Sequence, residues 1–117
     1  MIALTLPLPP SVNCYYGSRG NRRFIRKPGL VFRAKVAEIV SELCIPTLEG
    51  RVSLFVAIHP ASKKVHDLDN RAKSLQDALT HAGVWLDDSQ IDELHMVRRE
   101  VIKGGLVRVV ITEMDQP

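Results

Sequence analysis

Two segments of the chain, RVSLFVAIHP from Arg51 and LVRVVITEM from Leu106, place apolar side chains at every second position. The alternating residues are Leu54, Val56, Ile58, Val107, Val109 and Ile111. This period predicts two strands that each bury one face, so the chain must build a sheet. A first strand is predicted for MIALTLPL, ended by prolines, and IDELHMVRREVI is predicted to pair with LVRVVITEM as a β-hairpin that turns at Gly104 and Gly105.

Two other segments repeat apolar residues at three- and four-residue spacing, the period of an amphipathic helix. The first runs roughly from Leu30 to Leu43, and the second covers residues 70–82. Asp69 or Asn70 is expected to cap the second helix, and Gly83 to end it. The expected buried residues are Leu30, Ala34, Val36 or Ala37, Val40 and Leu43 in the first helix, and Ala72, Leu75, Leu79 and Ala82 in the second.

Residues 11–29 lack either period and contain several glycines and prolines, so they are predicted to form a long loop. The resulting order is strand, loop, helix, strand, helix, strand, strand. It predicts a single small α+β domain over residues 1–117, with a mixed β-sheet of about four strands and two helices packed on it. A chain of 117 residues, 45% of them hydrophobic, is long enough to bury such a core.

The N-terminal residues MIALTLPLPPSVN have no basic region and are interrupted by prolines, unlike a secretory signal peptide. No apolar run is long enough to span a membrane. Cys14 and Cys44 are too few for a disulfide framework or a zinc site. We therefore expect a cytoplasmic protein with reduced thiols and no membrane partner.

Charges of opposite sign are concentrated in different parts of this chain, whose net charge is +3. A basic segment without acidic residues contains Arg19, Arg22, Arg23, Arg26, Lys27, Arg33 and Lys35. An acidic segment contains Asp67, Asp69, Asp77, Asp87, Asp88, Asp92 and Glu93. A metal-dependent enzyme that acts on nucleic acid would need both, although either run can also be an ordinary solvated surface.

Asp67 and Asp69 lie two residues apart, so on extended backbone their carboxylates point the same way, about 7 Å apart. Two such carboxylates can share a hard cation, and oxygen ligands favour Mg²⁺ or Mn²⁺ over zinc. Lys73, four residues after Asp69, could hold a phosphate or form a surface ion pair with Asp69 and Asp77. Spacing alone leaves both roles open.

The second acidic element, Asp87 and Asp88, follows the second predicted helix. It can return to Asp69 only if the chain doubles back at Gly83; otherwise it would complete a site with a partner subunit. On extended backbone the two side chains point apart, so one is expected to be a ligand and the other to support the site without binding the metal. Spacing does not decide which.

The segments LPLPPSVNCYY, HDLDNRAKSLQDALTHAGVWLDDSQI and KGGLVRVVITEM together resemble the RusA-type Holliday-junction resolvase family over nearly the whole chain. The D-L-D-N-x-x-K and A-G-x-W-L-D-D elements are the most specific part of this resemblance. It implies that Asp67, Asp69 and Asp88 bind catalytic Mg²⁺, with Mn²⁺ as a substitute, and that Lys73 is needed for cleavage. Asn70 and Asp87 are then expected beside the metal ligands.

The resemblance also implies a homodimeric endonuclease that resolves four-way (Holliday) DNA junctions by paired symmetric nicks, in recombination and repair. The expected contacts to DNA phosphates come from Arg19, Arg22, Arg23, Arg26 and Lys27. Three alternatives remain open from the residues alone: a non-catalytic nucleic-acid-binding module, a metal-dependent nuclease acting on RNA, single strands or other branched substrates, and a phosphatase for small esters.

Overall fold

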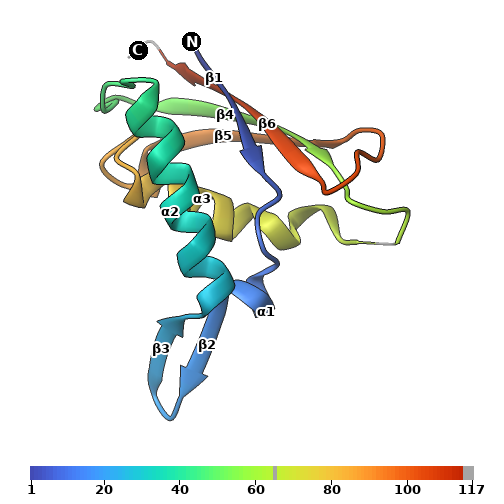
Figure 1. Ribbon diagram of the computed structural model, residues 1–117. Helices are drawn as coiled ribbons and strands as arrows, with labels where there is room; N and C mark the ends of the chain where they lie inside the picture. The colour runs from blue at the N-terminus through green and yellow to red at the C-terminus, as the bar shows by residue number, and fades with distance from the viewer. Residues whose placement is uncertain (65, 115–117) are drawn as a thin grey trace.

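The protein, described here by a computed structural model over residues 1–64 and 66–114, is built on a four-stranded sheet (Figure 1). Its strands are β1 (Ile2–Pro7), β4 (Val52–His59), β5 (Ile91–Arg98) and β6 (Leu106–Glu113), in the order β1-β6-β4-β5. β6 runs antiparallel to both β1 and β4, whereas β4 and β5 are parallel. The predicted mixed sheet of four strands is confirmed.

The predicted hairpin between residues 91–102 and 106–114 is wrong, because β4 lies between β5 and β6. The connection instead runs along the end of β4. The amide of Arg99 donates to the carbonyl of Ile58 at 2.8 Å, and that of Ile102 donates to Pro60 at 3.0 Å. Gly104 and Gly105, both with positive φ, then turn the chain into β6 as predicted. Because parallel strands require a long crossover, the segment between β4 and β5 carries a helix.

The alternating residues of the strands share one buried face. The register aligns Leu4 with Val109 and Val109 with Val56, which are all almost fully buried. The helices α2 (Lys27–Glu42) and α3 (Ala72–His81) pack against each other, and their apolar side chains complete the same cluster. The predicted α+β domain with two helices on the sheet is therefore confirmed (Figure 1).

Both helices differ in detail from the prediction. α2 begins three residues earlier and buries Gly29, Phe32, Val36 and Val40, while Leu30 and Leu43 are 53% and 56% exposed. The longer run of four-residue spacing, Phe32 to Val36 to Val40, therefore defines the buried face. α3 buries Ser74, Leu75, Ala78 and Leu79, whereas Ala72 and Ala82 are only half-buried.

The long loop predicted for residues 11–29 is also wrong. This segment forms the short helix α1 (Val12–Tyr15) and a two-stranded hairpin of β2 (Tyr16–Arg19) and β3 (Arg22–Ile25), which leads into α2. Gly20 has a φ of 63° at the first central position of the turn, a conformation that glycine adopts readily. Figure 1 shows the hairpin projecting from the body below α1 and the start of α2.

Within residues 1–64 and 66–114, no helix combines the length and the hydropathy needed to cross a membrane.

Candidate active site and nucleic-acid interface

Asp67 and Asp69 lie at the start of the crossover, where a short 3₁₀ helix, η1 (Leu68–Arg71), precedes α3. Asp67 has extended backbone, but Asp69 lies inside the 3₁₀ turn, so the expected extended pair is wrong. Leu68 packs against the core, and both aspartates that flank it are exposed. Burial of Leu68 thus fixes this turn on the surface with a carboxylate on either side of it.

The expected capping of the second helix by Asp69 or Asn70 is wrong as well. Asp67 is the N-cap of η1 and Arg71 that of α3, and neither makes a side-chain cap hydrogen bond. Two other side chains attach this end of α3 to the segment after β1. Arg71 donates to the carbonyl of Pro9, and the buried Ser74 hydroxyl donates to the carbonyl of Pro10 at 2.6 Å. These contacts hold Asp69 and Lys73 on a fixed helical end.

Lys73 is exposed in the first turn of α3. The proposed surface ion pairs with Asp69 and Asp77 do not form. Asp77 instead accepts a hydrogen bond from Arg33 Nε at 3.0 Å, and also one from the hydroxyl of Tyr15. Across the described residues we find no ion-pair partner for the ammonium group of Lys73. It is therefore available to an external anion.

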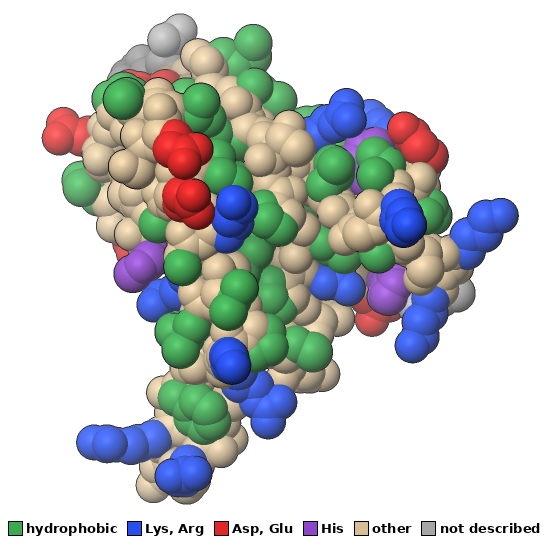
Figure 2. Space-filling model, in the orientation of Figure 1, with side chains coloured by type: hydrophobic (Ala, Val, Ile, Leu, Met, Phe, Trp, Pro, Cys, Tyr) green, Lys and Arg blue, Asp and Glu red, His purple; other side chains and the backbone are tan. Residues whose placement is uncertain are grey.

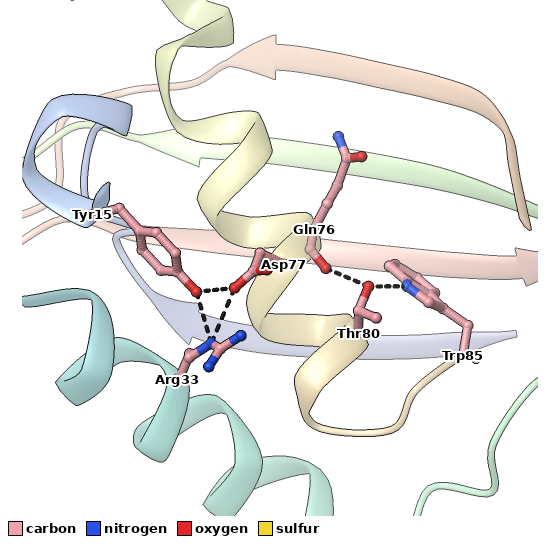
Figure 3. Close-up of polar contacts among 6 residues, drawn as sticks. All are labelled: Tyr15, Arg33, Gln76, Asp77, Thr80 and Trp85. Atoms are coloured by element: carbon pink, nitrogen blue, oxygen red, sulfur yellow. Dashed lines mark hydrogen bonds and ion pairs between the residues drawn. The ribbon is translucent and has the colours of Figure 1, made fainter. Parts of the chain in front are cut away.

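α3 ends at His81, and Gly83 stops the helix as predicted. This residue has a φ of 84°; its amide donates to Thr80 and that of Val84 donates to Leu79, the two bonds of a Schellman motif. The chain doubles back there. Trp85, only 1% exposed, anchors the returning segment, and its indole N–H donates to the hydroxyl of Thr80 at 2.6 Å (Figure 3).

The returning segment carries Asp87 and Asp88 at the start of a second 3₁₀ helix, η2 (Asp88–Gln90), which packs against α3. Asp87 caps it: its carboxylate accepts from the amide of Ser89 at 3.1 Å, and the side chain of Gln90 accepts from the amide of Asp87 at 3.0 Å. The hydrogen bonds with Ser89 lower the pKa of Asp87. Asp88 is exposed, and the described part of the chain gives its carboxylate no such partner. The geometry therefore assigns the structural role to Asp87 and leaves Asp88 available.

The pKa of Tyr16 responds to carboxylates of α3 and η2. Burial raises the pKa of Tyr16, the first residue of β2, and the negative charges of Asp77 and Asp88 contribute to that rise. The hydroxyl of the preceding residue, Tyr15, donates to Asp77 on α3, so the base of the hairpin lies against that helix. Tyr16 also packs beneath Arg23, whose guanidinium carbon lies 4.2 Å from the ring centroid.

Asp67, Asp69 and Asp88 have the donor chemistry of a site for a hard divalent cation, because all three are exposed carboxylates. No three Asp, Glu, His or Cys side chains of residues 1–64 and 66–114, however, are grouped closely enough to hold a metal ion. The ligand type thus fits Mg²⁺, but closing the site would require rotation of these exposed side chains or a contribution from a partner subunit. Asn70 lies beside Asp69 on η1, and its backbone N–H donates to the carbonyl of Asp67 at 3.3 Å.

The basic segment predicted to bind phosphates forms the hairpin and its junction with α2. Arg19, Arg22 and Arg23 are exposed on β2 and β3, while Arg26 and Lys27 are exposed at the start of α2. Figure 2 shows Lys and Arg side chains around this projecting end of the molecule. Phe24 is 45% exposed among them, and its ring lies over Gly17, where a Cβ would come within 2.5 Å of it. Open hollows flank this surface, one of about 320 Å³ lined by Asn13, Tyr16 and Arg23 among others.

Comparison with known proteins identifies relatives over nearly the whole chain. A family model described as "Endodeoxyribonuclease RusA" matches residues 7–112. The "Crossover junction endodeoxyribonuclease RusA" of Escherichia coli is 38% identical over 113 residues, which cover 96% of this chain and 94% of that protein. The protein of that name from Shigella sonnei shows the same identity and coverage. Its counterpart from Enterobacteria phage 82 is 39% identical over 112 residues, covering 95% and 93%.

Proposed function

Because this chain belongs to the RusA endodeoxyribonuclease family, we propose that it is a crossover junction endodeoxyribonuclease. It hydrolyses phosphodiester bonds of four-way DNA junctions and resolves them by paired symmetric nicks, in recombination and repair in the cytoplasm. The identity of more than a third of the residues, spread over 96% of the chain, supports this function. The observation that carries it is the attachment of the base of the basic hairpin to α3, the helix that carries Lys73, through the hydrogen bond from Tyr15 to Asp77.

Asp67, Asp69 and Asp88 would hold Mg²⁺, or Mn²⁺ in its place, at this site. The bound cation would neutralise charge on the scissile phosphate and lower the pKa of a water molecule. The exposed ammonium of Lys73 would stabilise the negative charge that develops on the phosphate. Asp87 contributes indirectly, since its cap holds η2 in the conformation from which Asp88 projects. Asn70 would support the turn that carries Asp69.

The direct test is a labelled four-way junction incubated with the protein, with and without Mg²⁺, and analysed on a denaturing gel. We expect symmetric nicks in two opposed strands with Mg²⁺ and none without it. Binding without cleavage in Mg²⁺ would favour a non-catalytic binding module. Faster cleavage of single-stranded DNA or RNA than of the junction would favour a nuclease of a different substrate class.

The enzyme would act as a homodimer. A four-way junction presents two equivalent strands related by a two-fold axis, and a C2 dimer presents two equivalent sites. A second subunit would also offer a way to complete a metal site whose ligands are not gathered within the described residues of one chain. Sedimentation at micromolar concentration should give a dimer; a monomer that still makes paired nicks would contradict this.

The hairpin should supply most of the salt-dependent affinity for DNA. Changing Arg19, Arg22 and Arg23 together to Ala should flatten the dependence of log K on log salt concentration by about 0.9 for each DNA phosphate that the protein no longer neutralises. Arg108→Ala is a matched control, because Arg108 is exposed on β6 between the inward-facing Val107 and Val109. Titrations of a labelled junction at several salt concentrations without metal measure this slope for the wild type and for both variants. An unchanged slope in the triple variant would exclude the hairpin as the DNA-binding element.

A further inference from the structure

A hydrogen-bonded network of Tyr15, Arg33 and Asp77 joins three elements that are far apart in the sequence (Figure 3). The hydroxyl of Tyr15 donates to Asp77 Oδ2, and Arg33 Nε lies 3.0 Å from both that oxygen and the Tyr15 hydroxyl oxygen. Tyr15 comes from α1, Arg33 from α2 and Asp77 from α3. The network therefore fixes three helices relative to one another.

The protonation states of the network suit a structural connection better than proton transfer. Burial raises the pKa of Tyr15, and the hydrogen bond and negative charge of Asp77 raise it further, so the phenol remains a donor. The carboxylate and the guanidinium neutralise each other's charge. Tyr15 is fully buried, and its hydroxyl is engaged with both other side chains. The group thus positions other residues and does not itself react with a substrate.

Tyr15 also forms the base of the hairpin. It directly precedes β2, and its carbonyl accepts a hydrogen bond from the amide of Arg26, just after β3, at 2.8 Å. A Cβ on Gly29 would come within 3.0 Å of the Tyr15 ring and carbonyl, so the first turn of α2 packs tightly against this residue. The Tyr15 ring contacts Tyr16 edge-on, and Arg23 lies over Tyr16. The direction in which the hairpin projects is therefore set at Tyr15.

At its other end, the network reaches the helix that carries the proposed catalytic groups. Asp77 is one helical turn after Lys73 on α3, so the two side chains lie on the same face. Asp69 lies on η1, which leads directly into α3. A change in the angle between hairpin and α3 would therefore displace a DNA phosphate held by the hairpin arginines relative to Lys73 and Asp69.

We propose that Tyr15, Arg33 and Asp77 are positioning residues, which lock the DNA-binding hairpin to α3 so that bound DNA meets Lys73 and Asp69 in a productive geometry. This inference rests on the proposed function for its effect on cleavage. Its structural part, the immobilised hairpin, can be tested independently of any activity. The competing explanation is that the network only adds stability to the fold.

Tyr15→Phe is the informative variant, because it keeps the buried ring and removes only the hydroxyl. Single-turnover cleavage at saturating protein should fall roughly 10- to 100-fold, since misplacement by about 1 Å costs up to that much. The dissociation constant for the junction without metal should change less than threefold, because no DNA-contacting arginine is altered. Ile111→Val is the control for lost stability: it removes one methylene group from a fully buried side chain of β6, outside the network and outside the segment that carries Asp88. It should lower the melting temperature without slowing cleavage of bound junction.

Amide hydrogen exchange provides the readout that does not depend on cleavage. In Tyr15→Phe, the amides of Arg26 and of β2 and β3 should exchange at least severalfold faster, while Ile111→Val should leave them unchanged. Equal cleavage by the two variants in the bound complex, or unchanged exchange in the hairpin of Tyr15→Phe, would overturn the proposal. If the wild-type protein does not cleave junctions at all, the proposed function fails, and exchange alone decides whether the network immobilises the hairpin.

Discussion

Replacing Asp69 with Asn should abolish junction cleavage while leaving junction binding intact, or slightly tighter without metal. The amide preserves the shape of the side chain but lacks the negative charge that a hard cation requires. A bound metal contributes several kcal/mol to catalysis, so the loss should exceed about 100-fold. Binding should survive because an ionised carboxylate next to DNA repels phosphates until a cation neutralises it.

The variant should also fold normally, because Asp69 is exposed and is not the residue that caps η1 or α3. Asp92→Asn is a suitable control. Asp92 is another partly exposed aspartate of the acidic segment, but it pairs with Arg51, which lowers its pKa. A binding gel, a cleavage gel and a melting curve on both variants test the assignment. Cleavage by Asp69→Asn near the wild-type rate in Mg²⁺ would remove Asp69 from the proposed ligands.

The sheet and the helices could be predicted because burial imposes a period on the sequence. Leu54, Val56 and Ile58 alternate in β4, and Leu75 and Leu79 repeat in α3. The order of the strands in the sheet was harder to predict, because the glycine turn after Lys103 suggested that the last two strands of the sequence pair with each other. The signal for the correct order is β4 itself. Its run LFVAI is apolar without a break, as is typical of a central strand, and the last four residues of β4 are all buried.

The hairpin at residues 16–25 was missed because its strands bury almost nothing. An exposed hairpin has no apolar alternation, and its basic residues suggested an unstructured loop. A local signal was nevertheless present. Gly20 and Asn21 are a typical pair for a two-residue hairpin turn, and the strand-favouring Tyr16, Phe24 and Ile25 flank them.

The candidate site could be proposed from the sequence where its residues are close together in the chain, and not where residues are brought together by folding. Asp67, Asp69 and Lys73 fall on one short motif, and Gly83 signalled that the chain turns back after α3. The network of Tyr15 and Asp77 spans a sequence separation of 62 residues, so no local pattern could reveal it. Sequence spacing likewise could not divide the roles of Asp87 and Asp88, because that division depends on which carboxylate caps η2.

The different roles of Asp87 and Asp88 lead to opposite expectations for variants of these two adjacent residues. Asp88→Asn should leave the melting temperature unchanged, because Asp88 is exposed and does not cap η2. It should reduce junction cleavage by at least about 100-fold through loss of a metal ligand. Asp87→Ala should instead lower the melting temperature by a few degrees, because the amide of Ser89 loses its acceptor. Cleavage should persist at a reduced rate, since Asp88 is retained but η2 is less firmly held.

The pH dependence of stability provides a second test of the structural role of Asp87. Hydrogen bonds from Ser89 lower the pKa of Asp87 in the folded protein, so its contribution to stability is present above the pKa of an unfolded aspartate and is lost as pH falls through the folded value. Asp87→Ala should therefore lose less stability on acidification than the wild type. Melting curves between neutral pH and about pH 3 measure this difference over the range in which aspartates titrate. If Asp87→Ala abolished cleavage and Asp88→Asn retained it, the two roles would be reversed, and the metal ligand on this segment would be Asp87.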